Sequence, residues 1–394
     1  MIRKVWPLVV AAIALGIDAY VLAGVLPQIA TSLATTVAMI GLGVTAFTGA
    51  YAIAGPLLSG RLTRGNTARA ILIALGIFNL GNLITAIAPG VEVFLASRVV
   101  AGAGAGILTA VATATAAAMV KDEKRGRAMA MVTFGLSTGT VAGVPVGMLI
   151  GQSAGWRWTM GLVVLIGVLS MAALAVRARA LPQLDVAASE PAFKVLRSSK
   201  TSVGIIAAFL LGIASLGLYT YLLPMAEARG LADWGFGLVW AWGIGGVTGS
   251  ALIGKPLDKF GAKPFLVILP ALLGLSFATA WLLSSPAAWL IAAIVWGAAG
   301  WASVPTVQQA LTADQPRQAM PIIAFQMAAM YLGSAVGSAL GSSLLTAGTD
   351  AADLAAWALI PAVLALVLTA WIAFARRRRE SPQQAETVAC EATS

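Results

Sequence analysis

Long apolar stretches separated by short polar connections run along almost the whole chain. Each stretch holds roughly 20 residues, which is enough for an α-helix to cross the ~30 Å hydrocarbon layer of a membrane. The pattern is not the alternation over about 10 residues that is typical of an outer-membrane barrel. It predicts an all-α polytopic membrane protein. The twelve predicted spans are 6–26, 38–59, 69–88, 93–119, 128–150 and 158–176, followed by 202–225, 235–254, 264–284, 287–311, 321–345 and 353–375.

The composition excludes a soluble enzyme and argues against a metal site. Of the 394 residues, 59% are hydrophobic and 10% are charged, whereas soluble domains carry about a quarter charged residues. The chain has no His, and its single cysteine, Cys390, lies in a polar tail, so neither imidazole nor paired thiolates can bind a metal. The sequence also shows no Walker phosphate loop and no catalytic triad. We therefore expect no enzymatic activity, no ATP hydrolysis and no cofactor.

The basic residues are concentrated on one side of the predicted membrane. All but three of the 25 Lys and Arg residues fall in the connections and tails that share a side with the termini; the exceptions are Arg98, Arg157 and Arg229. Because basic loops stay in the cytoplasm, we expect both termini there. The net charge of +10 then follows from topology, and we expect no binding of nucleic acid.

The two halves of the chain repeat each other. Leu26-Pro27 at the end of the first span corresponds to Leu223-Pro224 in the seventh, and residues 60–62 correspond to 254–257. Duplicated halves are typical of secondary transporters, whose substrate site lies near the midplane between them. The prediction is a six-helix bundle over 1–176, a cytoplasmic linker over 177–201, a second six-helix bundle over 202–375 and a basic, then polar, cytoplasmic tail over 376–394.

Two motifs resemble those of the major facilitator superfamily. Residues 254–263, which include Asp258, Lys259 and Gly261, resemble the family's loop motif of Gly, Asp, basic, Gly and basic residues. Residues 95–106 in the fourth span combine an Arg with a series of glycines, and they resemble a motif of the proton-coupled members.

A third motif indicates one branch of this family. Residues 139–147, followed by 155–157, are similar to the span-five motif of the twelve-helix drug:proton antiporters, and residues 22–27 resemble chloramphenicol and arabinose or sugar exporters. The resemblance covers essentially residues 5–375. It implies two six-helix bundles, alternating access powered by a proton gradient, a small-molecule substrate, a bacterial inner membrane and a monomer. The residues to which it gives a motif or conformational role are Gly139, Gly143, Pro145, Gly147, Arg61, Asp258, Lys259 and Gly261.

The chain departs from the family pattern at two places. In the first-half loop, Arg64 stands where the family usually has Asp, and Thr67 stands where it has Gly. This departure affects the charge contact that usually joins helices on that side of the protein. In the first span, many such exporters carry a Glu at the position of Ala19, whereas Asp18 lies one residue earlier and is rotated ~100° around the helix.

Asp18 is the only acidic residue well inside a predicted span. A carboxylate in hydrocarbon costs several kcal/mol, so it needs a partner, a watery cavity or a proton. Asp18 lies about 12 Å and Arg98 about 9 Å from the outer ends of their helices, at similar depth. If the two side chains meet, Arg98 can favour the charged carboxylate in one state and release it for protonation in another. The alternatives are a static ion pair that joins spans one and four, or no contact.

Glycines at 135, 139, 143, 147 and 151 form a row on one face of the fifth span. Such a row lets another helix approach backbone to backbone. One interpretation is a flexible or tightly sealing element that makes the protein an exporter. The other is ordinary packing of small residues, and the two are compatible.

The substrate cavity is predicted from the family architecture, which lines it with spans one, two, four and five and their second-half counterparts. Aromatic side chains with a few amides suit a fairly apolar, weakly polar drug, although each aromatic could instead pack in the membrane or anchor at its surface. A dicationic substrate is not expected, because no second buried carboxylate exists. The predicted lining residues are Leu22, Phe47, Tyr51, Tyr219, Trp240, Trp296, Gln308, Phe325 and Gln326.

These observations favour a drug:proton antiporter that exports small amphipathic compounds, with Asp18 and Arg98 as its proton-coupling pair. One alternative is a dedicated exporter of a sugar, nucleoside or other metabolite, which would have a narrow substrate range. The other is a transporter-like receptor without any flux of its own.

Overall fold

The computed structural model describes residues 2–35, 37–64, 66–184 and 192–374, and within these residues every regular element is a helix. The first half contains α1 (Ile2–Ser32), α2 (Val37–Thr63), α3 (Thr67–Ile87), α4 (Val91–Ala118), α5 (Arg125–Ala154) and α6 (Trp156–Val176). The second half contains α7 (Ser199–Leu211), α8 (Leu222–Ala228), α9 (Gly235–Leu252), α10 (Gly254–Phe260), α11 (Phe265–Leu282), α12 (Pro286–Thr312), α13 (Ala319–Thr346) and α14 (Leu354–Phe374).

A helix occupies every predicted span. Among the described residues, ten helical segments are long and apolar enough to cross a membrane. The remaining two spans are occupied by α1 and α5, which have 31 and 30 residues and pack against each other. The all-α prediction is therefore confirmed, and the basic tail predicted over 376–394 lies outside the described residues.

The structure corrects two predicted spans, namely the end of the first and the continuity of the seventh. Helix α1 continues to Ser32, beyond the predicted end at residue 26, and buries Ile29 in the core. The seventh span is not one continuous α-helix, because α7 runs into a π-helix over Gly212–Gly217 and then breaks before α8. Pro224 lies in the first turn of α8, where backbone N–H groups have no partner within the helix. Its missing N–H therefore costs no helical hydrogen bond.

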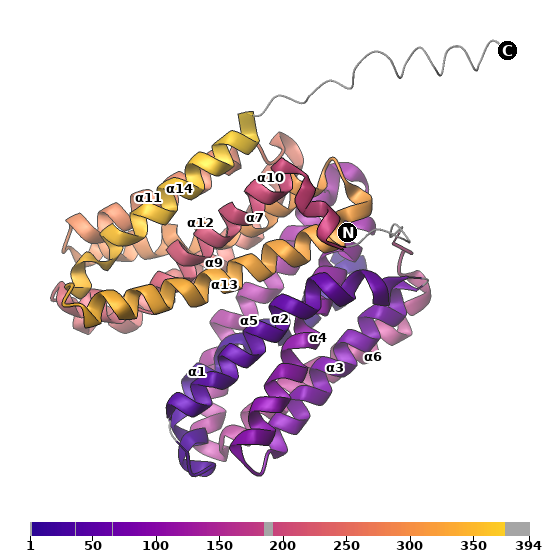
Figure 1. Cartoon of the computed structure of the whole chain (residues 1–394), viewed down its shortest axis with the longest axis horizontal. Coiled ribbons are helices and arrows are strands. Elements are labelled where there is room, and N and C mark those ends of the chain that lie inside the picture. Colours follow the sequence, from indigo (N-terminus) through magenta and orange to yellow (C-terminus); the bar gives the residue numbers. More distant parts are fainter. Residues whose placement is uncertain (1, 36, 65, 185–191, 375–394) are drawn as a thin grey trace.

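The helices form two bundles that share one packing scheme (Figure 1). In the first bundle α1 packs on α5, α2 on α4 and α3 on α6. In the second bundle the equivalent spans make the same pairs, because α7 packs on α13, α9 on α12 and α11 on α14. The sequence repeat is therefore also a repeat of helix contacts.

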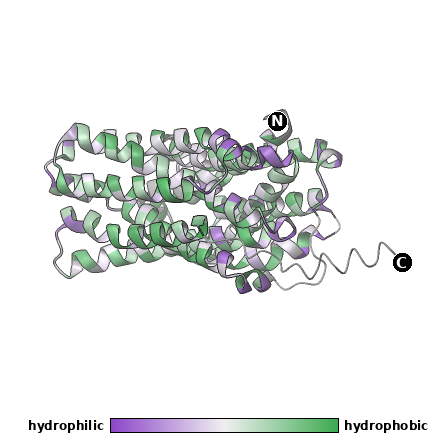
Figure 2. Cartoon of the chain, turned by 90° about the horizontal axis from the view of Figure 1, so that it is seen from above, coloured by the Kyte–Doolittle hydropathy of each residue, from purple (hydrophilic) through white to green (hydrophobic). Residues whose placement is uncertain are grey.

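The bundles touch each other on the side where the chain begins and ends, which we call the terminal side. There α5 contacts α9, α10 and α12, while α13 contacts α2 and α4. The hydroxyls of Ser137 in α5 and Ser250 in α9 lie 2.8 Å apart across this contact. Away from the terminal side the two bundles diverge (Figure 1). Hydrophobic residues cover the length of the helices, and hydrophilic residues gather at their ends (Figure 2).

Candidate functional site

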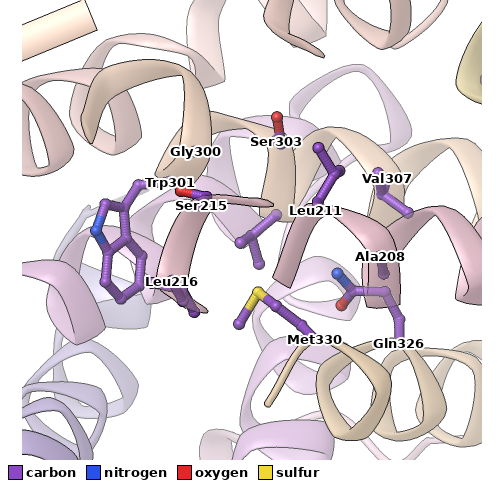
Figure 3. A pocket seen from close by; sticks show the side chains of 11 residues that line it. Ala208, Leu211, Ser215, Leu216, Gly300, Trp301, Ser303, Val307, Gln326 and Met330 are labelled. Atoms are coloured by element: carbon purple, nitrogen blue, oxygen red, sulfur yellow. The ribbon is translucent and has the colours of Figure 1, made fainter. Parts of the chain in front are cut away.

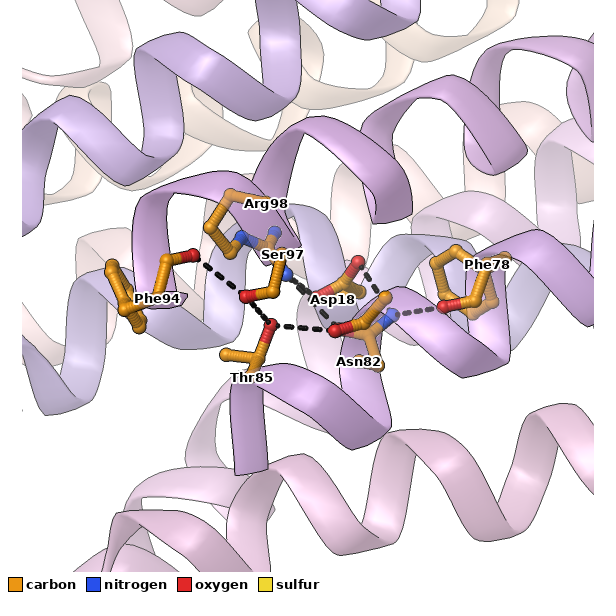
Figure 4. Close-up of polar contacts among 8 residues, drawn as sticks. Asp18, Phe78, Asn82, Thr85, Phe94, Ser97 and Arg98 are labelled. Carbon is orange, nitrogen blue, oxygen red and sulfur yellow. Dashed lines mark hydrogen bonds and ion pairs between the residues drawn. The ribbon is translucent and has the colours of Figure 1, made fainter. Parts of the chain in front are cut away.

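Asp18 and Arg98 meet inside the first bundle. The Arg98 Nη1 atom donates to Asp18 Oδ1 at 2.9 Å, and the two side chains are 1% and 0% exposed, respectively. Asn82 of α3 lies between them, because its Nδ2 donates to Asp18 Oδ2 at 3.1 Å and its Oδ1 accepts from Arg98 Nη1 at 3.0 Å. Figure 4 shows the three side chains pointing toward one another from α1, α3 and α4. The predicted contact between Asp18 and Arg98 therefore exists, and it includes a third group.

The surroundings of Arg98 hold its guanidinium in place. Its Cζ atom lies 4.5 Å from the centre of the Phe47 ring, a cation–π contact. At Gly43 of α2, a Cβ would come 3.3 Å from the Arg98 side chain and closer still to Phe94. Close by, the hydroxyls of Thr85 and Ser97 lie 2.7 Å apart between α3 and α4. Phe47 thus belongs to the charge network and not to an open cavity.

Asn82 was not predicted as a site residue. Its signal in the sequence is an amide inside an apolar span, because a buried polar group in a membrane helix needs a partner. The same signal also marks Asn79, one turn earlier on α3. Among the described residues, no partner donates to or accepts from the Asn79 amide, which packs against Gly167 of α6. The sequence signal alone therefore does not separate the two asparagines.

The glycine row of α5 faces α1. A Cβ at Gly139 would overlap the Ile13 carbonyl oxygen, and a Cβ at Gly143 or Gly147 would overlap side chains of α1. Gly16 of α1 makes the reciprocal contact with the backbone of α5. The row thus joins two helices of one bundle at backbone distance, while the side chain of Pro145 lies outside the described residues.

Asp258 of the loop motif bridges the two bundles on the terminal side. Its Oδ1 accepts from the backbone N–H of Arg127 at 3.0 Å, and its Oδ2 forms an ion pair with Arg127 Nε at 3.1 Å. Asp258 lies on α10, and Arg127 lies in the first turn of α5. The free N–H groups at the start of a helix stabilise a negative charge such as the Asp258 carboxylate. We call this contact the α5–α10 latch.

The other motif residues take no part in the latch. Gly261 ends α10 with a φ of 72°, which favours glycine. The Lys259 ammonium lies 4.9 Å from the centre of the Phe260 ring. Arg61 is exposed in the last turn of α2.

A cavity lies between the bundles, near their contact, and we call it the interface cavity. Its polar groups are three threonine hydroxyls and the amide of Gln308. The lining residues are Ala12 and Leu15 of α1, Leu108, Thr109, Ala112 and Thr113 of α4, Val132, Thr133 and Leu136 of α5, Val304 and Gln308 of α12 and Met327 of α13. The residues from α1, α4 and α5 face those from α12 and α13, as expected for a site between two halves.

A further cavity lies inside the second bundle, beside the π-helix, and we call it the second-bundle cavity (Figure 3). Gln326 and Met330 of α13 approach it from one side, and Ser215 and Trp301 line another part. The remaining lining residues are Ala208, Leu211, Leu216, Gly300, Ser303, Val304 and Val307.

Of the predicted cavity residues, the structure places only Gln308 and Gln326 in these cavities. Tyr51 packs edge-on against Tyr331 with ring centres 4.8 Å apart, a contact between the bundles. Tyr219 stacks on Trp242 at 3.9 Å. The Trp296 Nε1 atom donates to Ser215 Oγ at 3.0 Å, so Trp296 supports the second-bundle cavity from behind.

Three predicted lining residues lie elsewhere. Leu22 is buried in the core of the first bundle. Phe325 packs against Phe193 of the connection between the bundles, with ring centres 5.3 Å apart. Trp240 is 37% exposed and packs against Phe236, in a stripe of exposed apolar side chains that suits contact with lipid. The family architecture indicates which helices line a cavity but not which face of each helix.

Within the described residues, no group of three or more His, Cys, Asp or Glu is placed to bind a metal ion. The cavities are lined mainly by apolar side chains, with isolated hydroxyl and amide groups. The groups that line the cavities are therefore hydroxyls, amides and apolar side chains, while the buried ion pair of Asp18 and Arg98 lies inside the first bundle.

Comparisons with known proteins agree with this architecture. The sequence model of the Major Facilitator Superfamily matches residues 8–321. The chain is 32% identical to a chloramphenicol resistance protein of Streptomyces lividans over 350 residues, covering 86% of this chain and 88% of that protein. It is 27% identical to the inner membrane transport protein YdhP of Escherichia coli (strain K12) over 370 residues, or 92% and 93% of the two chains.

Solved structures show the same fold. The crystal structure of the human organic anion transporter MFSD10 superimposes with a TM-score of 0.76 at 17% identity, covering 93% of this chain and 99% of that one. This likeness confirms the predicted arrangement of twelve membrane helices in two bundles. The family match and the similarity to the Streptomyces protein confirm the predicted resemblance. The chain therefore belongs to the Major Facilitator Superfamily, and it is a multi-pass membrane transporter of small molecules and not an enzyme.

Proposed function

We propose that the chain is a drug:proton antiporter that exports small amphipathic compounds across a bacterial inner membrane by alternating access. The observation that carries this proposal is the fully buried Asp18 carboxylate, held by Arg98 and Asn82. A buried charge is stable only while its partners remain, and removing one partner of such a pair typically costs 3–5 kcal/mol. Protonation of Asp18 would remove that charge without moving any atom of the protein backbone.

The contacts of α1 connect this event to the rest of the molecule. Helix α1 carries Asp18 and packs backbone to backbone on α5 through Gly16 and Gly139. Helix α5 in turn carries Arg127 of the α5–α10 latch and lines the contact with the second bundle. When Asp18 is protonated, Arg98 loses its countercharge and α1 is held less tightly to α3 and α4. Through α5, this change favours separation of the bundles on the terminal side.

The distribution of basic residues indicates how the proposed exporter is oriented in the membrane. If the basic terminal side is cytoplasmic, the structure has its bundles joined on the cytoplasmic side and diverging toward the outside (Figure 1). A proton would then reach Asp18 from outside, and the substrate would be loaded after the bundles open to the cytoplasm. The similarity to YdhP, an inner membrane transport protein, supports this location.

The lining of the cavities supports a weakly polar substrate. Apolar side chains such as Leu15, Leu136 and Val304 predominate, and the polar groups are hydroxyls and amides. Such a site suits a compound with an apolar body and few polar groups. The similarity to a chloramphenicol resistance protein supports a drug of that kind.

Reconstituted vesicles with an imposed pH gradient test this function. We expect the full chain to accumulate chloramphenicol against its concentration gradient when the gradient is present, and to stop when a protonophore collapses it. The Asp18→Asn variant should lose this accumulation but keep exchange of labelled for unlabelled chloramphenicol, which needs no net proton movement. Equal accumulation by both proteins would contradict the role of Asp18. A saturable response limited to a sugar or nucleoside would favour the dedicated metabolite exporter.

A further inference from the structure

The amide groups of Gln308 and Gln326 form a pair at the wall between the two cavities. Gln308 of α12 lines the interface cavity, Gln326 of α13 lines the second-bundle cavity, and Val304 lines both. Gln308 Nε2 donates to Gln326 Oε1 at 3.2 Å, and both side chains are 2% exposed. The pair thus connects two helices and two cavities at a place that neither the proton site nor the latch uses.

One atom of this pair has no partner. Among the described residues, nothing donates a hydrogen bond to Gln308 Oε1, although the atom is fully buried. An unpaired buried carbonyl oxygen costs about 1–3 kcal/mol. Because this one lies beside a cavity, a donor that enters the cavity can complete it. Of the three threonines that line the interface cavity, Thr109 and Thr133 donate to carbonyl oxygens of their own helices.

The charges around the pair define what can complete it. None of the described residues that line the two cavities is Asp, Glu, Lys or Arg. Asp18 lines neither cavity, and its oxygens accept from Arg98 and Asn82 inside the first bundle. A third cavity, on the terminal side, is lined by Arg125 and Arg317, which repel cations.

We propose that the Gln308–Gln326 pair recognises the substrate, and that the substrate is an uncharged molecule with an N–H or O–H donor for Gln308 Oε1. The interface cavity has a volume of about 10 Å³ in this conformation, so the bundles must move apart before an apolar body can pack against Leu15, Leu136 and Met327 beside Gln308. This inference rests on the proposed function, since it names the substrate class of that exporter. Cations are excluded as substrates, because burying a charge without a partner is far more costly than burying an amide or a hydroxyl.

Equilibrium binding to the full chain in detergent tests this inference without any proton gradient. The first probe is radiolabelled chloramphenicol, which is uncharged and carries hydroxyl and amide donors. The second is ethidium, a permanent cation, used as a competitor. The variant Gln308→Met keeps the length of the side chain and removes its amide group. The matched control is Gln152→Met, at an exposed position near the end of α5 that lies away from the terminal side.

We expect the wild type to bind chloramphenicol saturably, and Gln308→Met to bind it at least about tenfold more weakly, as loss of one buried hydrogen bond predicts. Gln152→Met should bind as the wild type does, and ethidium should compete at least about tenfold more weakly than unlabelled chloramphenicol. If Gln308→Met does not give monodisperse protein, Gln308→Asn withdraws the amide by one methylene and should show the same loss.

Three results would overturn the inference: equal binding of chloramphenicol by Gln308→Met and the wild type, absence of saturable chloramphenicol binding, or tighter binding of ethidium. The proposed function fails in a different way. If binding depends on Gln308 but vesicles show no proton-driven accumulation, the recognition site stands and the antiport mechanism does not.

Discussion

At the scale of single residues, the protein depends on how one carboxylate is partnered. Asp18 receives a guanidinium donor from Arg98 and an amide donor from Asn82, each from a different helix. The carboxylate is therefore held by one charged partner and one neutral partner. Removing the charged partner would leave a buried charge unpaired, which is the more costly loss.

Replacing Asn82 with Leu should loosen the contact between α1, α3 and α4 and slow proton-coupled transport. The substitution removes the hydrogen bonds of the Asn82 amide to Asp18 and Arg98, and a hydrogen bond to a charged group is worth about 1.5–3 kcal/mol. We expect a loss of stability of that size and a slower initial rate of proton-driven chloramphenicol uptake into vesicles. Unchanged stability and rate would show that Asn82 only packs α3 on α1.

Asn79→Leu is the matched control on the same helix. Its amide has no partner among the described residues, so the substitution removes a buried polar group and breaks no hydrogen bond seen there. We expect an unchanged uptake rate and a stability equal to the wild type or higher by about 1 kcal/mol. A clear loss of stability would mean that the Asn79 amide makes a contact in the membrane.

The sequence located Asp18 and Arg98 but not Asn82. Depth along a helix follows from counting residues at a fixed rise, and that was enough to place Asp18 and Arg98 at one level. The third partner depends on how α3 is rotated against α1 and α4, and counting does not reveal rotation. Gln308 and Gln326 were predicted from the helices they occupy, but their hydrogen bond to each other was not.

At the scale of helices, the contact between α1 and α5 is the one most sensitive to size. Gly139 has the Ile13 carbonyl where a Cβ would lie, whereas Gly76 of α3 has nothing within 4 Å of such a position. Both glycines lie inside a helix, so alanine has the same effect on helix propensity at each position. The difference in stability between the two variants then measures the effect of packing.

We expect Gly139→Ala to lower the stability of the protein by about 1–3 kcal/mol, because α1 and α5 must move apart. Gly76→Ala should leave stability unchanged or raise it by about 0.5–1 kcal/mol, the usual gain for this change within a helix. Thermal unfolding of the purified proteins in detergent compares the two. Equal effects of both substitutions would show that the backbone contact of α1 and α5 is loose.

The helix boundaries show what an apolar pattern can and cannot predict. Twelve spans were found because each must be long and apolar to cross the membrane. The break before α8 and the short helix α10 were not predicted, because hydropathy does not distinguish a continuous helix from an interrupted one. Pro224 was the available signal for the break, since proline is best tolerated in the first turn of a helix.

At the scale of the whole molecule, the α5–α10 latch joins the bundles from the second-half loop. In the first-half loop, the equivalent of Asp258 is Arg64, which is exposed. The two halves thus have the same helix contacts but different charges on the terminal side. The repeat predicted the shared contacts, and the departure of Arg64 from the family pattern indicated the difference.

We expect Asp258→Asn to shift the molecule toward separated bundles on the terminal side. The substitution removes the ion pair with Arg127 and weakens the charge-assisted hydrogen bond, together worth about 1–3 kcal/mol, or at least a fivefold change in population. Spin labels on Lys121→Cys and Lys263→Cys, with Cys390→Ser, allow the distance between the bundles to be measured.

The control for the latch is Asp314→Asn. Asp314 pairs with Lys200 at 2.7 Å, and both residues flank helices of the second bundle. Its loss should leave the distance distribution between the labels unchanged. If both variants shift the distances equally, surface charge on the terminal side controls the bundles and the latch has no separate role.

The central claim is that Asp18 carries the proton that drives export. Vesicles with a pH dye inside measure this most directly, because addition of chloramphenicol should drive protons in the opposite direction through the wild type. The decisive variant combines Asp18→Asn with Arg98→Met, which removes both buried charges and leaves neither unpaired. We predict that this protein folds, binds chloramphenicol and moves no protons in response to it. Drug-driven proton movement at the wild-type rate in this variant would contradict the account and make the buried pair purely structural.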